Sequence, residues 1–131
     1  MELSNAKIVG LGSDLADVER IRQSVSRYGD RFLHRVFTPG EIAYVSTKAN
    51  WGERYAARFA AKEAGMKALG TGWAQGVSWQ EFEVVNLASG RPTLQLHGKA
   101  AEYAAQRGAR YIHLTLTHTA TLAMAVVILE A

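Results

Sequence analysis

The chain has 131 residues, of which 48% are apolar and 21% are charged, a balance typical of one globular domain with its own core. It contains no cysteine, which excludes disulfides, thiolate nucleophiles and cysteine–zinc sites and fits a reducing cytoplasm. The formal net charge of +3 favours an acidic partner, but no run of Arg and Lys interleaved with aromatics predicts nucleic-acid binding.

Neither export nor membrane insertion is predicted. The opening MELSNAK lacks the order of charged, apolar and small residues that a secretory signal has. The longest strongly apolar run, 122–129, is far too short to span a bilayer. We therefore expect a cytoplasmic protein with a single domain over residues 1–131 and no membrane partner.

The predicted elements mix helices and strands without repeats or linkers. The pattern favours an α+β fold, a mostly antiparallel sheet packed against helices, over a doubly wound sheet. Residues 32–37 favour neither helix nor strand. In the first half of the chain we expect a strand over 7–12 that ends in glycines, a helix over 17–28 that Gly29 can end, a helix from the Thr38-Pro39-Gly40-Glu41 cap to about 47, and a helix over about 52–69. In the second half we expect strands over 82–87 and 93–96, a helix over 99–107, and two antiparallel strands across a turn near 120–121.

The segment FAAKEAGMKALGTG, residues 59–72, places Lys62 and Glu63 among the apolar neighbours of a predicted helix. Glu63 falls within the apolar stripe of that helix, and Lys67 stands one turn beyond it, close enough for an i,i+4 pair. Two interpretations stand side by side. Either the long charged side chains snorkel past a narrow core stripe, or the inward carboxylate has a partner such as a metal ion.

Asp14 is the second acidic candidate. It follows the predicted strand and the sequence GLGS, which lacks the full glycine pattern of a phosphate loop. Its plain interpretation is a turn or N-cap carboxylate. An acid at a strand end together with an inward acid on a helix would also suit Mg²⁺, which takes one or two carboxylates and completes its shell with water and substrate phosphate.

Two further groups of side chains have both a plain and a functional interpretation. In IHLTLT the apolar residues 112, 114 and 116 face one way, and the hydroxyl and imidazole groups face the other. These groups and the following His118 could hold phosphate oxygens, or the segment could be an ordinary half-exposed strand with a threonine ladder. Likewise, Arg20, Arg22 and Arg27 form a basic helix face that is either a docking surface or simply solvated.

Considered together, these segments resemble one family, the holo-acyl-carrier-protein synthases. The resemblance is carried, in order and spacing, by GLGSDLADVERI, FTPGE, RFAAKEAGMKALGTG, WQEFEVVNLASGRPTLQLHG and IHLTLTHT, and covers residues 8–128. These synthases are the short, stand-alone members of the phosphopantetheinyl transferase superfamily. The resemblance implies the fold of that superfamily and the transfer of 4′-phosphopantetheine from coenzyme A to a serine of apo-acyl carrier protein. The by-product would be adenosine 3′,5′-bisphosphate. The reaction would serve fatty acid biosynthesis, a part of lipid metabolism.

The resemblance also implies roles for individual residues. Asp14 and Glu63 match the magnesium ligands, and Glu63 could take the serine proton directly or through a metal-bound water. Lys67 matches a catalytic lysine that contacts phosphate oxygens beside the metal. The other implied contacts to coenzyme A are Lys62 as a second cation, Arg58 near the 3′-phosphate, the backbone of Gly70, Thr71 and Gly72, and the pair His118 and Thr119.

The partners implied are an acidic carrier protein and further copies of the chain. Arg20, with Arg22 and Arg27, matches the helix that docks the carrier protein. The small class of the family forms homotrimers with active sites at subunit interfaces, and the last predicted strand, apolar on both faces, agrees with a strand covered on both sides.

The chain also departs from family patterns. Larger superfamily members have a second acid where this chain has Ala16, so water should complete the metal shell. Residues 49–51 are Ala-Asn-Trp where many relatives have a basic pair, so Lys48 or Arg54 could take over contacts to the adenosine end.

Two other function classes stay open at this point. One is a different magnesium-dependent phosphoryl or nucleotidyl transferase that uses Asp14, Glu63 and Lys67. The other is a non-catalytic module whose arginine face docks acidic proteins. A melting-temperature shift that coenzyme A alone produces among nucleotides, in the presence of Mg²⁺, would separate these classes.

Overall fold

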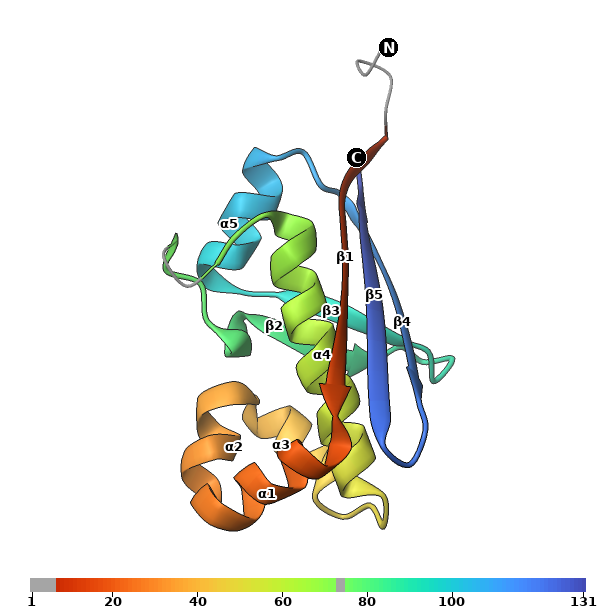
Figure 1. Cartoon of the computed structure of the whole chain (residues 1–131). Helices are drawn as coiled ribbons and strands as arrows, with labels where there is room; N and C mark the ends of the chain where they lie inside the picture. Colours follow the sequence, from red (N-terminus) through yellow and green to blue (C-terminus); the bar gives the residue numbers. More distant parts are fainter. Residues whose placement is uncertain (1–6, 73–74) are drawn as a thin grey trace.

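The computed structural model describes residues 7–72 and 75–131 and has an α+β architecture (Figure 1). The strands are β1 (Ile8–Asp17), β2 (Phe82–Asn86), β3 (Pro92–Leu96), β4 (Tyr111–His118) and β5 (Leu122–Glu130). The helices are α1 (Val18–Tyr28), α2 (Asp30–Val36), α3 (Pro39–Val45), α4 (Trp51–Leu69), the short 3₁₀ helix η2 (Trp79–Glu81) and α5 (Gly98–Gln106).

Within these described residues, all strand pairings are antiparallel, as predicted, but the strands form two sheets. One sheet has the order β1-β5-β4, and the other is the β2–β3 hairpin. In the larger sheet Asp14 is the partner of Ala125, which in turn is the partner of Leu116 on β4. The α+β prediction is confirmed, and the C-terminal hairpin β4–β5 lies where the alternating pattern indicated.

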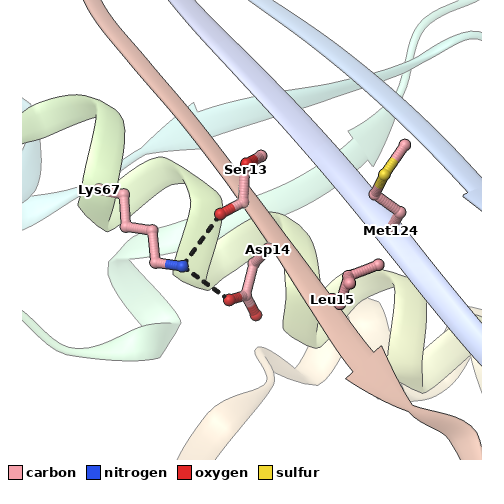
Figure 2. Close-up of a pocket in the computed structure, with 5 residues that line it drawn as sticks. All are labelled: Ser13, Asp14, Leu15, Lys67 and Met124. Carbon is pink, nitrogen blue, oxygen red and sulfur yellow. Dashed lines mark hydrogen bonds and ion pairs between the residues drawn. The ribbon is translucent and has the colours of Figure 1, made fainter.

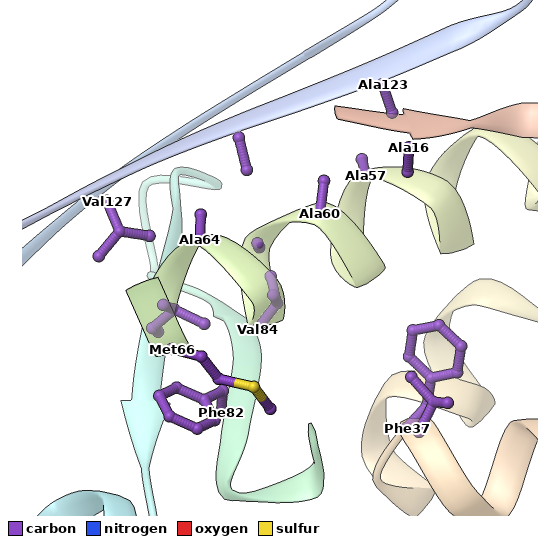
Figure 3. Packing of buried hydrophobic residues seen from close by; sticks show 14 of the residues in the cluster. Ala16, Phe37, Ala57, Ala60, Ala64, Met66, Phe82, Val84, Ala123 and Val127 are labelled. Carbon is purple, nitrogen blue, oxygen red and sulfur yellow. The ribbon is translucent and has the colours of Figure 1, made fainter. Parts of the chain in front are cut away.

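Helix α4 lies at the centre of the fold and is covered on both sides. Ala57, Ala60 and Ala64 point toward β1 and β5 (Figure 3), while Gly65 faces Phe82 of the hairpin β2–β3. Small side chains on one face allow the helix to lie close to the sheet, and the opposite face packs on larger apolar groups. The helix is therefore buried almost all round, rather than along the single apolar stripe that we predicted.

Strand β1 extends through the glycines at which we expected it to end. A Cβ atom on Gly10 would lie 2.0 Å from the carbonyl oxygen of Ala68, and one on Gly12 would lie 2.1 Å from that of Ala64. Both glycines are thus needed where the backbone of β1 touches the backbone of α4, not for a turn. Asp14 consequently lies inside the strand, and the prediction that it follows the strand is wrong.

The three helices before α4 form a separate cluster at one end of the sheet (Figure 1). Helix α1 is capped at its start by Asp17, whose side chain accepts from Arg20 N at 3.0 Å, and at its end by Gly29 with a φ of 54°. Helix α3 has the predicted capping box between Thr38 and Glu41 but ends at Val45, two residues earlier than expected. The segment that favoured neither state, residues 32–37, forms most of the helix α2 and its C-cap, Phe37.

The outer face of the three-stranded sheet is mostly apolar along β1 and β5 and polar along β4, where it carries His113, Thr115 and Thr117. β5 alternates between residues buried against α4 and partly exposed apolar residues on the other face. The large exposed apolar side chains of this sheet are Ile8, Leu11, Leu15, Tyr111, Leu122 and Met124.

In the part of the chain that the structure describes, no helix is both long and apolar enough to cross a bilayer.

Candidate active site

A cavity of about 420 Å³ lies beside β1, at the edge of the three-stranded sheet. Ser13, Asp14 and Leu15 line it from β1, Lys67 from α4 and Met124 from β5 (Figure 2). The close backbone contact of β1 with α4 sets this geometry, because it brings a strand carboxylate within reach of a helix ammonium.

Lys67 and Asp14 form an ion pair at the mouth of this cavity. Lys67 Nζ donates to Asp14 Oδ1 at 2.9 Å and to the carbonyl oxygen of Ser13 at 3.0 Å. The Asp14 side chain is 20% exposed and that of Lys67 is 59% exposed, so solvent and a ligand can reach both. The sequence had suggested Glu63 as the partner of Lys67, one turn earlier on the same helix.

Glu63 is half-buried beside this pair. Burial raises the pKa of Glu63, and the negative charge of Asp14 raises it further. A hydrogen bond from the Trp79 side chain and the charge of Lys67 act in the opposite direction. Two carboxylates thus lie close enough to repel each other in a partly desolvated place, which an added cation would relieve.

The donor set fits Mg²⁺. Asp14 and Glu63 supply hard carboxylate oxygens, and Asp14 opens to a cavity with room for water and phosphate oxygens. Among residues 7–72 and 75–131, no third His, Cys, Asp or Glu joins them in a cluster. A site with two carboxylates suits magnesium, which usually keeps several waters, better than a metal that needs a full protein cage.

Lys62 does not reach this site. The structure therefore corrects the prediction that Lys62 contacts coenzyme A. Its side chain is 0% exposed, and its ammonium donates to Glu41 Oε1 at 2.7 Å and to the carbonyl oxygen of Phe82 at 2.8 Å. Burial lowers the pKa of Lys62, and the neighbouring Glu41 charge opposes that shift. Lys62 is therefore an internal tie between α3, α4 and β2, not a group open to a ligand.

Arg58 lies away from Asp14, in a second cavity of about 280 Å³ between α3, α4 and β2. It is 6% exposed, and its guanidinium carbon lies 5.1 Å from the centre of the Tyr44 ring. Lys48 Nζ and the Arg54 guanidinium face the same ring at 4.8 and 5.8 Å. Three cations thus surround one exposed tyrosine.

The glycine-rich segment after α4 lies one turn beyond Lys67. Gly70 ends the helix with a φ of 75°, a left-handed conformation that favours glycine. Thr71 N donates to the carbonyl oxygen of Met66, and Gly72 N donates to the Gln75 side chain. The backbone N–H groups of this segment have partners within the chain.

His118 and Thr119 lie at the β4–β5 turn, apart from the cavity at Asp14. His118 is the strand partner of Ala123, and Thr119 Oγ1 accepts from Leu122 N at 3.1 Å. Neither residue is among those that line the cavity. Through Ala123, His118 lies two strands away from Ala16, the residue two positions after Asp14.

The three arginines of α1 differ in their surroundings. Arg20 is exposed beside a groove of about 230 Å³ that Leu15 and Phe59 also line. Arg22 forms an ion pair with Glu53 of α4. Its guanidinium also makes a cation–π contact with Trp51 of α4, 5.0 Å from the ring centre. Arg20 is therefore free to meet a partner, whereas Arg22 contributes to packing between α1 and α4.

Sequence reasoning missed two contacts at the site. The Ser13 carbonyl oxygen accepts from Lys67, which its position next to Asp14 could have indicated. Trp79 comes from η2, sixteen residues after Glu63, and no local pattern points to its contact with the carboxylate. The two elements meet in space, since the centre of the Trp79 ring lies 5.8 Å from that of Phe59 on α4.

Comparison with known proteins identifies a family for this arrangement. A sequence model of the 4′-phosphopantetheinyl transferase superfamily matches residues 10–127. A protein from Solibacter usitatus named holo-[acyl-carrier-protein] synthase is 67% identical over 123 residues, which cover 94% of this chain and 98% of that protein. One of the same name from Koribacter versatilis is 56% identical over 123 residues, with the same coverage.

Solved structures with the same fold include two such synthases. The crystal structure of the enzyme from Neisseria meningitidis matches with a TM-score of 0.86 and 28% identity, covering 95% of this chain and 99% of the other. That from Bacillus anthracis, in complex with coenzyme A (3′,5′-ADP), matches with a TM-score of 0.78 and 34% identity, covering 96% and 99%.

Proposed function

The chain belongs to the 4′-phosphopantetheinyl transferase superfamily, and we propose that it transfers 4′-phosphopantetheine from coenzyme A to a serine of an apo-acyl carrier protein. The single observation that carries this proposal is the pair of carboxylates Asp14 and Glu63 beside the cation Lys67, at an open cavity. In the reaction the serine oxygen bonds to the phosphorus of the phosphopantetheine, and the bond from that phosphorus to the adenosine 3′,5′-bisphosphate breaks.

Asp14 and Glu63 are the donor set that the site offers, and they would hold Mg²⁺. When bound, the ion would offset the charge of the pyrophosphate and of the leaving phosphate. Lys67 supplies a mobile cation for phosphate oxygens once it leaves Asp14, and its 59% exposure leaves it free to do so. Glu63, whose pKa is raised by burial and by Asp14, is the candidate base for the serine proton.

The adenosine end of coenzyme A needs a second set of contacts. His118, Thr119 and Arg58 are not among the residues that line the cavity at Asp14. A homotrimer with active sites at the subunit interfaces would bring these residues from one subunit to the acidic pair of the next. The exposed apolar face of the sheet, with Leu11, Leu15 and Met124, supports such an assembly.

The acyl carrier protein would dock at α1. Arg20 stands exposed three residues after the N-cap Asp17, close along the chain to Asp14. An acidic partner steered to this face would place its serine near the acidic site. This reaction would supply holo-acyl carrier protein to fatty acid synthesis in the cytoplasm, as the sequence led us to expect.

Mass spectrometry of an apo-acyl carrier protein incubated with coenzyme A, Mg²⁺ and the full chain tests the proposal. The expected result is a mass increase of one phosphopantetheinyl group, together with adenosine 3′,5′-bisphosphate in the supernatant. Omission of Mg²⁺ and the Asp14→Asn variant serve as controls and should give unmodified carrier protein. An unmodified carrier protein with the wild-type chain and Mg²⁺ would overturn the proposal.

A further inference from the structure

Strand β1 is an edge of the three-stranded sheet, since β5 pairs with it on one side and the described part of the chain places no strand on the other. In an antiparallel pair, residues whose backbone N–H and C=O groups bond to the partner strand alternate with residues whose groups face away from it. The second kind of residue on β1 presents its backbone groups to the free edge. Two hydrogen bonds identify these residues.

Ser13 and Leu15 are residues of this second kind. Val18 N donates to the carbonyl oxygen of Thr121 at 2.9 Å, which continues the β1–β5 register and places the even-numbered residues of β1 at the bonded positions. The carbonyl oxygen of Ser13 accepts from Lys67 Nζ at 3.0 Å, so it faces away from β5, in agreement with this assignment (Figure 2). By the same alternation, the N–H and C=O groups of Leu15 face the free edge.

This part of the edge lies at the cavity of the acidic site. Leu15 lines the cavity from β1, together with Ser13 and Asp14. Met124, the strand partner of Leu15, lines it from β5, and both side chains are exposed and apolar. The cavity therefore has an uncharged wall beside the ion pair of Asp14 and Lys67. A ligand with a charged end and an extended, uncharged part that carries amides fits this arrangement.

Coenzyme A has such a structure, because its pyrophosphate continues into the pantetheine arm, which contains two secondary amides. We propose that the N–H and C=O groups of Leu15 bond to the first amide of this arm, the one nearer the pyrophosphate, as the backbone of a neighbouring strand would. Two residues along a strand span roughly 6.6 Å, so an arm that starts at Lys67 reaches its first amide near Leu15. This inference rests on the proposed function for the identity of the ligand.

A second explanation competes with this one. A free edge also pairs with strands of other chains, here with a second copy of this chain. Such a strand would cover Leu11 as well as Leu15, because both face outward on the edge. The arm instead begins in the cavity, and Leu11 is not among the residues that line it. The two explanations therefore predict different results at the two positions.

Proline tests both positions, since it removes the N–H group and is tolerated where that group of an edge strand faces outward. Leu15→Pro is compared with Leu15→Ala, which loses the side chain but keeps the N–H group. Leu11→Pro and Leu11→Ala are the matched control pair on the same edge. Titration calorimetry on the full chain with Mg²⁺ measures the Kd for coenzyme A and for adenosine 3′-phosphate 5′-diphosphate, which keeps the pyrophosphate and lacks the arm.

We expect Leu15→Pro to bind coenzyme A about tenfold more weakly than Leu15→Ala does, because the arm amide loses its donor. The two variants should bind the ligand without the arm equally, and Leu11→Pro should bind coenzyme A as Leu11→Ala does. Affinities of Leu15→Pro and Leu15→Ala for coenzyme A that agree within about twofold would overturn the inference. Equal losses at positions 11 and 15 would also overturn it, as would a wild-type chain that binds the two ligands equally.

A change in the ligand covers the case in which Leu15→Pro does not fold, as judged by its melting temperature. The wild-type chain is then titrated with a coenzyme A analogue in which an ester replaces the first amide. The ester lacks the N–H group and accepts more weakly, so binding about tenfold weaker is expected, and an affinity equal to that of coenzyme A overturns the inference. A wild-type chain that prefers coenzyme A to the ligand without the arm, but transfers nothing, would contradict the proposed function alone.

Discussion

The Lys62 ammonium donates to the Glu41 carboxylate at 2.7 Å, and solvent reaches neither side chain. Glu41 also accepts from the backbone nitrogens of Thr38 and Val84, each at 2.9 Å. The neighbouring residues Lys62 and Glu63 therefore leave α4 in different directions. One side chain ties α3 and β2 to the central helix, and the other reaches the acidic site.

Replacement of Lys62 by Met should therefore destabilise the fold. Glu41 would stay buried without its counter-charge, and breaking such a pair costs about 3–5 kcal/mol. Urea unfolding followed by circular dichroism measures the loss. The double variant Lys62→Met with Glu41→Gln should recover part of it, and a single variant as stable as the wild type would contradict the structural role of the pair.

Gly12→Ala should separate β1 from α4. Its Cβ atom would lie 2.1 Å from the carbonyl oxygen of Ala64 and 2.6 Å from Ala68 N, both backbone atoms that cannot rotate away. We expect a loss in the free energy of unfolding of about 3 kcal/mol. The control is Gly72→Ala, where a Cβ atom meets nothing within 4 Å, and equal stability of the two variants would contradict the close contact.

Asp14→Asn and Glu63→Gln should each lower kcat by about a hundredfold or more at ordinary Mg²⁺, because each removes one charged ligand. Neither change empties an apolar cavity, so melting temperatures should stay near that of the wild type. Excess Mg²⁺ should restore metal occupancy in Glu63→Gln more readily than rate, since the base is also lost. Near-full activity with unchanged Mg²⁺ dependence in either variant would remove the metal assignment.

Arg20→Ala should raise the KM for the carrier protein with a smaller effect on coenzyme A, because Arg20 is exposed on the docking face. Salt at about 0.5 M should weaken wild-type docking, since the Debye length falls well below 10 Å. Arg22→Ala should instead lower the stability by about 1 kcal/mol, through loss of the contacts with Glu53 and Trp51. An unchanged carrier KM in Arg20→Ala would exclude this docking surface.

Glu83 should contribute to the acid limb of the stability curve. Burial tends to raise the pKa of Glu83, but bonds from Thr38 and His97 outweigh it and hold the pKa below the ordinary 4.5. A lowered carboxylate pKa gives stability that is present above the unfolded pKa and is lost as the pH falls through the folded pKa. Between about pH 5 and pH 3, the wild type should therefore lose more stability than Glu83→Gln.

Denaturant unfolding over this pH range checks the prediction for Glu83. Glu102→Gln on the exposed side of α5 is the control and should lose stability as the wild type does. Parallel curves for Glu83→Gln and the wild type would show that the bonds to Thr38 and His97 add nothing.

Patterns within one segment were enough to predict most of the elements. The capping box at Thr38 and Glu41, the glycine that ends α1 and the alternation along β4 are local features, and the structure confirms them. The acidic candidates Asp14 and Glu63 were also visible, since a charged residue stands out among apolar neighbours. The segments that resemble a known family gave these residues their predicted roles.

What the sequence could not decide depended on contacts between distant segments. Gly10 and Gly12 were expected to end the strand, but they form a close backbone contact inside it, because the atoms that require them belong to Ala64 and Ala68, more than fifty residues later. Lys62 and Glu63 looked alike, yet one is buried against Glu41 and the other faces Asp14. Helical periodicity fixes the direction in which a side chain leaves its own axis, but the packing of other elements around that axis determines whether it meets a counter-charge, a hydrogen-bond donor or water.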